Sequence, residues 1–117
     1  MIEELVSRVF ATRDAAHREH WKTKSFAKHS ALGEFYDALP SKIDMIVEMY
    51  QGAFGLIEPK SGSTTKIDNI VQHIADEADW IDKNRSKIAE EVCAIENALD
   101  ELCGLYLTTF YKLKNLS

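Results

Sequence analysis

Apolar residues recur every three or four positions along most of this chain, and this helical period constrains its fold more than any other feature. The pattern forms four stripes, over residues 2–20, 32–50, 67–81 and 88–113. No segment alternates apolar and polar residues as a half-buried strand would. One clear linker, residues 52–63, divides the stripes into two pairs and holds three of the five glycines and one of the two prolines. The pattern predicts an all-α protein, an up-down four-helix bundle with a longer connection between its second and third helices, in a single domain over residues 1–117.

The boundaries of these helices follow from local signals of unequal strength. Ser25 is placed to cap the second helix. Pro40 lies inside the second stripe, but the stripe keeps its phase, which predicts one bent helix that ends at Gly52. Residues 63–65 are suited to cap the third helix. No glycine or proline separates the third helix from the fourth, and the most polar stretch, residues 82–86, is the predicted break.

Charge and hydropathy exclude several classes of function. The formal net charge is −5, and three nearby lysines, Lys22, Lys24 and Lys28, form the only local basic cluster. A nucleic-acid-binding protein is therefore disfavoured. The chain has no long apolar run that would cross a membrane and no signal peptide at its start, so we expect a cytoplasmic protein.

Three of the four histidines, His17, His20 and His29, lie within residues 16–30, where any chemistry of this chain is expected to begin. No glycine-rich phosphate loop or nucleophile motif is present. His20 falls near the centre of the first apolar stripe. A lone histidine in such a place is more often a core residue with its hydrogen bonds satisfied than a metal ligand. His17, one turn earlier, is more often a surface residue than an alternative ligand.

Asp44 and Glu48 are four residues apart, so their carboxylates share one face of the second helix. Such a pair is most often two ordinary solvated acids. Their phase adds information, because they lie roughly 140° and 180° from Leu39 at the centre of the stripe. They point away from the core of the bundle. A metal ion held by this pair would therefore lie on the outer face of the helix, against a second chain.

The segment that runs from His20 to Gly52 resembles the signature of the Dps-type miniferritins, a branch of the ferritin-like superfamily. Its sequence is HWKTKSFAKHSALGEFYDALPSKIDMIVEMYQG. The family's motif residues appear here as His20-Trp21, Phe26, His29, Tyr36, Asp44 and Glu48. The ending LTTFYKLKNL is similar to the aromatic end of that family's last helix.

The resemblance implies a ferritin-like fold and a ferroxidase centre at a two-fold subunit interface. On this reading, His20 and His29 of one subunit and Asp44 and Glu48 of the other hold iron, or alternatively manganese or zinc. Fe(II) is oxidised there by O2 or peroxide. The protein is then a homo-oligomer, at least a dimer formed through its first two helices. Nucleic acid is not an expected partner, because no lysine-rich tail is present.

Two departures from the family pattern keep a second interpretation open. Gly33 stands where the family has an acid, and the turn between His20 and His29 is three residues shorter. The alternative is a ferritin-like bundle with a degenerate metal site that acts as a structural or interaction module. His73 lies among Asp76, Glu77 and Asp79 on a face interpreted as mostly solvated, and it carries only a weak signal for a second metal site.

Overall fold

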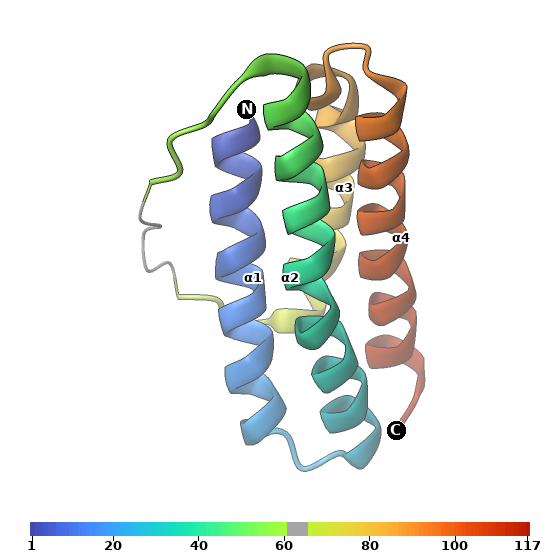
Figure 1. Ribbon diagram of the computed structural model, residues 1–117. Helices are drawn as coiled ribbons and strands as arrows, with labels where there is room; N and C mark the ends of the chain where they lie inside the picture. The colour runs from blue at the N-terminus through green and yellow to red at the C-terminus, as the bar shows by residue number, and fades with distance from the viewer. Residues whose placement is uncertain (61–65) are drawn as a thin grey trace.

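The computed structural model describes residues 1–60 and 66–117, which fold into four α-helices without a strand. The helices are α1 (Ile2–Lys22), α2 (Phe26–Phe54), α3 (Ile70–Ala89) and α4 (Cys93–Asn115). This confirms the predicted all-α four-helix bundle with a longer connection between the second and third helices. Figure 1 shows α1 and α2 side by side in front of α3 and α4.

Neighbouring helices in the bundle are antiparallel. α2 packs on both α1 and α4, and α4 packs on α3, whereas the seam between α1 and α3 is much less closely packed. The connection between Phe54 and Ile70 joins opposite ends of the bundle, so α2 and α3 run in the same direction (Figure 1). A hydrogen bond of 3.1 Å between Tyr50, near the end of α2, and Glu90, just after α3, agrees with this direction. One broad face of the bundle is made mainly of α1 and α2.

The core is built from the apolar stripes, as the helical period predicts. Phe35 of α2 and Tyr106 of α4 meet edge to face near its centre, with ring centroids 5.0 Å apart. Each is at most 1% exposed. Full burial of one large apolar side chain contributes about 1.5–3 kcal/mol. One continuous cluster of such side chains therefore holds all four helices together.

The predictions for the first two helices are mostly confirmed. The side chain of Ser25 caps α2 by accepting a hydrogen bond from the backbone N–H of Lys28. α2 continues through Pro40 as one helix. Its predicted end at Gly52 is wrong, because the helix runs on to Phe54 and closes at Gly55. That residue has φ 106°, a left-handed conformation that glycine adopts at little cost.

The predictions for the last two helices need correction. The proposed caps at 63–65 lie outside the described residues, and α3 begins at Ile70, capped by Asn69. The predicted break at 82–86 is wrong. Arg85 in that stretch bonds to Glu96 and Asp100 of α4, so the polar residues join two helices rather than separate them. The chain turns instead at Glu90 and Glu91, with φ 48° and 70°. Glutamate rarely adopts this conformation, so two glutamates are not a recognisable turn signal.

Candidate metal-binding face of α1 and α2

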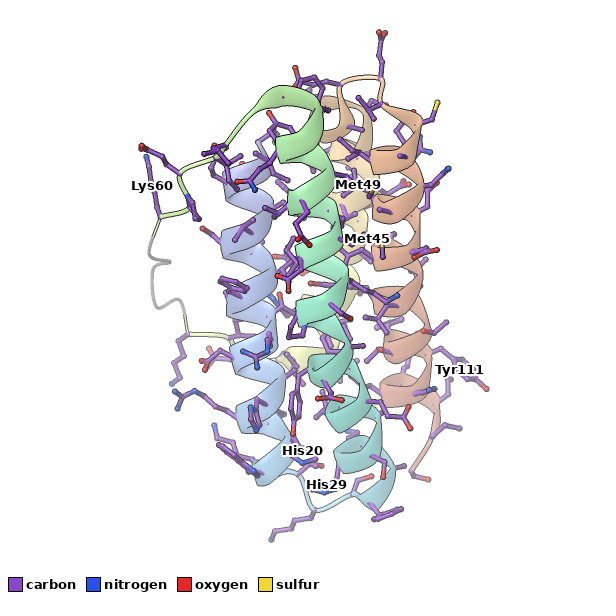
Figure 2. All side chains as sticks on the ribbon, viewed as in Figure 1. His20, His29, Met45, Met49, Lys60 and Tyr111 are labelled. Atoms are coloured by element: carbon purple, nitrogen blue, oxygen red, sulfur yellow. The ribbon has the colours of Figure 1, made fainter. Side chains whose placement is uncertain are left out.

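The turn between α1 and α2 holds His20 and His29 together at one end of the bundle (Figure 2). Their rings stack, with centroids 3.7 Å apart and planes inclined by 18°. Nδ1 of His20 lies 2.6 Å from the backbone carbonyl of His29, and Nδ1 of His29 lies 2.9 Å from the carbonyl of His20. A carbonyl oxygen only accepts, so both Nδ1 atoms carry a proton and each neutral ring keeps a lone pair on Nε2. Carbonyl bonds fix the same tautomer in many metal-ligating histidines.

Gly33 makes room for this histidine pair. A Cβ atom at position 33 would lie 3.1 Å from Cε1 and 3.3 Å from Nδ1 of His20, closer than ordinary van der Waals contact. The ring of His20 therefore uses the space that any other side chain at position 33 would need. In the sequence, Gly33 was notable only because it replaces an acid of the family pattern. In the structure, its missing side chain leaves room for the ring of His20.

Aromatic side chains extend the histidine pair across both helices. His17 stacks on Tyr36 with ring centroids 4.0 Å apart and planes inclined by 13°. Trp21 lies 4.5 Å from His17, centroid to centroid, yet 69% of its surface is exposed. His17 is therefore a half-buried linking residue rather than the free surface residue that the sequence favoured. The tryptophan is therefore a large apolar group that is mostly exposed.

Asp44 and Glu48 are exposed on α2, as their phase predicts. They border a groove of about 320 Å³ between α1 and the segment that follows α2. Gln51 shapes one wall, because its side-chain oxygen accepts a hydrogen bond of 3.2 Å from the backbone N–H of Ile57. The groove is otherwise mostly apolar, and its remaining lining residues are Val6, Phe10, Ile43, Val47 and Pro59.

The four predicted ligands form two separate halves within one chain. His20 and His29 lie together, but Asp44 and Glu48 follow His29 by 15 and 19 residues on the same helix. These separations correspond to roughly 22 and 28 Å along the helix axis. Nowhere in residues 1–60 and 66–117 do three His, Cys, Asp or Glu side chains come close enough to hold a metal ion. A complete four-ligand site on this face therefore needs a second chain.

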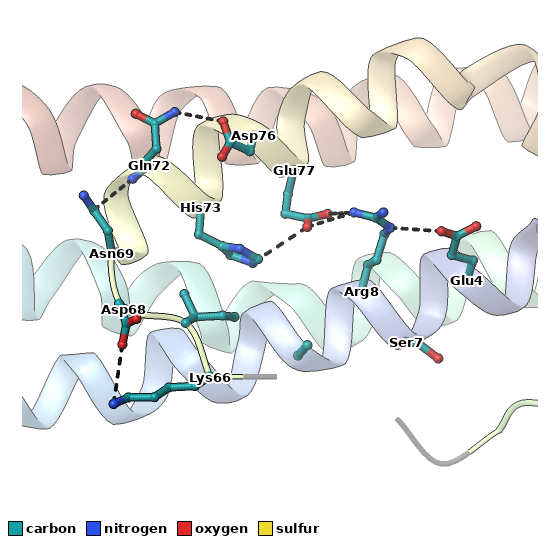
Figure 3. A pocket seen from close by; sticks show the side chains of 12 residues that line it. Glu4, Ser7, Arg8, Lys66, Asp68, Asn69, Gln72, His73, Asp76 and Glu77 are labelled. Atoms are coloured by element: carbon teal, nitrogen blue, oxygen red, sulfur yellow. Dashed lines mark hydrogen bonds and ion pairs between the residues drawn. The ribbon is translucent and has the colours of Figure 1, made fainter. Parts of the chain in front are cut away.

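A polar network that the sequence did not predict lies in the opposite seam, between α1 and α3 (Figure 3). Arg8 donates to both carboxylate oxygens of Glu77, at 3.0 and 3.1 Å, and its guanidinium lies 4.2 Å from the centre of the Trp80 ring. The hydroxyl of Thr12, which is fully buried, lies 2.8 Å from Nε2 of His73. Of these residues, Arg8, His73 and Glu77 border an open cavity of about 620 Å³.

The environment of His73 favours its neutral form. Burial lowers the pKa of His73 and Arg8 lowers it further, while Glu77 and Asp76 act in the opposite direction. The interpretation of this face as mostly solvated is therefore wrong for His73 and Glu77. Two signals were available in the sequence: the four-residue spacing of His73 and Glu77, and Thr12 as a polar interruption of the first apolar stripe.

Comparisons with known proteins place the chain in a family. Residues 20–113 match the model of a family of unknown function, DUF5856. The chain belongs to that family. It is also similar to an uncharacterized 14.6 kDa protein from the mobD-ri intergenic region of Enterobacteria phage T4. The two are 27% identical over 112 residues, which cover 95% of this chain and 86% of the phage protein. No solved structure matches the chain.

These matches correct the resemblance inferred from the motif. Neither of them points to the Dps-type miniferritins or to the ferritin-like superfamily, so the predicted membership is wrong. The motif misled because it consists of a few common residues at helical spacing, and many four-helix bundles can carry such a set. The four predicted ligands all fall inside the matched region, and the geometry described above stands independently of the family.

None of the helices in residues 1–60 and 66–117 is both long enough and apolar enough to span a lipid bilayer.

Proposed function

We propose that this protein binds a divalent transition metal, with Fe(II) as the first candidate, between two copies of the chain. His20 and His29 of one copy supply the imidazoles, and Asp44 and Glu48 of the other supply the carboxylates. The observation that carries the proposal is the histidine pair, in which two Nδ1–H groups are fixed on backbone carbonyls and two Nε2 atoms are left to bind. The activity to be tested is the oxidation of Fe(II) to Fe(III) by O2 or peroxide.

The donor set fits the proposed metals. Imidazole together with carboxylate suits iron, manganese and zinc, whereas a site for calcium or magnesium would be built from oxygen atoms alone. The two Nδ1 bonds also close the short turn between α1 and α2, and this contribution to stability is compatible with metal binding at Nε2. Homo-oligomerisation and a cytoplasmic location are parts of the same proposal.

An anaerobic titration with Fe(II), followed by addition of O2, tests the proposal. We expect saturable binding and fast appearance of ferric absorbance in the wild type. Both should be lost in His20→Gln/His29→Gln and in Asp44→Asn/Glu48→Gln. The control is Asp76→Asn/Asp79→Asn, which removes two exposed carboxylates from α3 and should change neither. Wild-type protein that binds no Fe(II) would refute the proposal.

Mixing the two inactive variants tests whether each site spans two copies. A mixed dimer combines intact histidines from one chain with intact carboxylates from the other, so it has one complete site of two. Half of randomly paired dimers are mixed, and the mixture should therefore recover about a quarter of the wild-type sites. Recovery of none would refute a site shared between two copies.

A second candidate function, an interaction module, is favoured by a different observation. The same face exposes Phe10 at the apolar groove and Trp21 at the histidine end, each at more than half of its surface. A protein without metal affinity would still carry this surface, and exposed apolar patches commonly mark interaction sites. Nucleic acid remains a disfavoured partner, given the net charge of −5.

A further inference from the structure

We infer that the face of α1 and α2 docks against the same face of a second copy, in antiparallel orientation, with Trp21 of each copy seated in the groove of the other. The groove is the one bordered by Val6, Phe10, Val47 and Ile57. This inference rests on the same pairing of copies as the proposed metal site, but it requires no metal. It names the anchor of the interface and fixes its register.

The register follows from the positions of the two halves along the helices. Because His20 stacks on His29, Trp21 lies level with the first turn of α2, around residues 28–30. The groove is centred on Val47 of the same helix. A two-fold axis that places Trp21 of each copy level with Val47 of the other crosses α2 near residues 37–39. An axis at the same height brings His29 level with the stretch from Asp44 to Glu48 of the second copy. The pairing of Trp21 with the groove and the pairing of the histidines with the carboxylates therefore require the same two-fold axis.

The axis also lies close to the middle of α2, so the two faces overlap along nearly their whole length. The molecule measures 44 by 26 by 21 Å, and even the narrower of its long sides is roughly 900 Å². Stable interfaces bury about 800 Å² on each partner. The face is therefore large enough for a stable dimer without further elements.

Charge along the face favours a second copy over an unrelated partner. Residues 13–28, at the histidine end, contain five basic residues and two acidic ones. Residues 42–58, beside the groove, contain three acidic residues and one lysine. Antiparallel docking places the basic end of each copy on the acidic end of the other, whereas parallel docking would place like charges together.

Trp21 and the groove complement each other chemically. The indole is 69% exposed, and its contact with His17 holds it over the outer face. Tryptophan side chains bury 150–250 Å² when covered, and they are enriched among the residues that dominate binding energy at interfaces. Most of the residues that line the groove are apolar, and the polar ones are Asp44, Glu48 and Gln51. This is the surface against which an indole ring is best covered.

Sedimentation of the metal-free protein in EDTA tests the docking without the metal site. We expect a concentration-dependent dimer whose Kd rises at least about 30-fold in Trp21→Ala, the effect of losing one dominant interface residue. The matched control is Leu107→Ala, which truncates an apolar side chain of similar exposure (55%) on α4. It should leave the Kd unchanged. A wild type that stays monomeric, or a dimer insensitive to Trp21→Ala, would overturn the inference.

Disulfide trapping tests the register directly. Cys93→Ser/Cys103→Ala removes the two native thiols. In that background, Trp21→Cys chains mixed with Val47→Cys chains should cross-link to each other, and Leu107→Cys chains mixed with Val47→Cys chains should not. Equal cross-linking in both mixtures contradicts the proposed register.

The two proposals can fail separately. Cross-linked dimers that bind no Fe(II) would refute the metal site and leave the docking intact. Fe(II) binding by a protein that remains monomeric would overturn the docking, and it would assign the metal to donors of one chain.

Discussion

The two sides of α1 differ in how far their polar side chains are paired within the chain. On the side of α3, Arg8 and Thr12 find their partners, Glu77 and His73, within the same chain. On the side of α2, His20 and His29 bond to each other's backbone through Nδ1 only, and Trp21 stays 69% exposed. The polar side chains of the first seam are therefore hydrogen-bonded to one another. The second seam contains the groups that we propose bind a metal ion and a second copy of the chain.

This difference separates a structural histidine, His73, from the two histidines that we propose as metal ligands. Burial lowers the pKa of His73, and its Nε2 is engaged by Thr12. His20 and His29 use the opposite nitrogen for structure, which leaves Nε2 for binding. Substitutions in the α1–α3 seam should therefore change stability, and substitutions on the face of α1 and α2 should change binding.

The largest effect on stability is expected from Arg8→Ala. The change leaves the carboxylate of Glu77, which is 9% exposed, without its bidentate partner, and it removes the contact with Trp80. Because Arg8 itself is partly exposed, we expect a loss of about 2–3 kcal/mol, just below the usual range for breaking a buried ion pair. Urea unfolding measures the loss, and Fe(II) binding should not change.

Two further variants show whether the ion pair itself is the cause. Arg13→Ala removes an exposed arginine from the same helix and should cost less than about 0.5 kcal/mol. Arg8→Met/Glu77→Leu replaces both charges by apolar groups and should recover most of the stability, because no charge is left buried alone. An Arg8→Ala variant as stable as Arg13→Ala would remove the contrast between the two sides.

A smaller loss is expected from Thr12→Val, which keeps the shape of the side chain and removes its hydroxyl. Nε2 of His73 then loses its partner at 2.8 Å in a half-buried position. The loss of one such hydrogen bond costs about 1–2 kcal/mol. Thermal unfolding at pH 7.5 measures it. Thr108→Val on α4 is the control, since that hydroxyl is exposed and bonds only to the backbone of its own helix. Equal effects of the two changes would contradict a special role for Thr12.

The sequence predicts the fold well because helical periodicity is a local property. It predicts the outward direction of Asp44 and Glu48 for the same reason, since phase along one helix needs no knowledge of its neighbours. It fails where the decisive contact is distant. The partners of Arg8 and Thr12 lie more than 60 residues away. The floor of the groove includes Ile57 and Pro59, which the composition assigns only to a linker.

The pH dependence of stability should reveal His73. Because burial lowers its pKa in the folded state, the unfolded chain takes up a proton at this residue at a higher pH than the folded chain does. His73 therefore costs no stability well above pH 6.5 and reduces stability as the pH falls below that value. Free energies of unfolding at pH 7.5 and 5.5, measured for the wild type and for His73→Gln, should show a smaller decrease in the variant. Equal decreases would show that His73 does not contribute.

The smallest effect on stability, and the most selective effect on function, is expected from Gly33→Ala. An added methyl group in a helix interior normally stabilises by about 1 kcal/mol, but here it presses on Cε1 of His20 at 3.1 Å. The gain and the crowding should nearly cancel, to within about 0.5 kcal/mol. Displacement of the ring should still weaken Fe(II) binding by at least about tenfold, as the loss of ligand orientation does at metal sites.

Gly104→Ala is the matched control for this change, because Gly104 also lies inside a helix and a Cβ there meets nothing within 4 Å. It should show the full gain in stability and no change in Fe(II) binding. If both variants gained equally and both bound Fe(II) like the wild type, the space beside Gly33 would have no bearing on His20. The histidine pair would then be only a clasp for the turn, and the two sides of α1 would differ in structure but not in function.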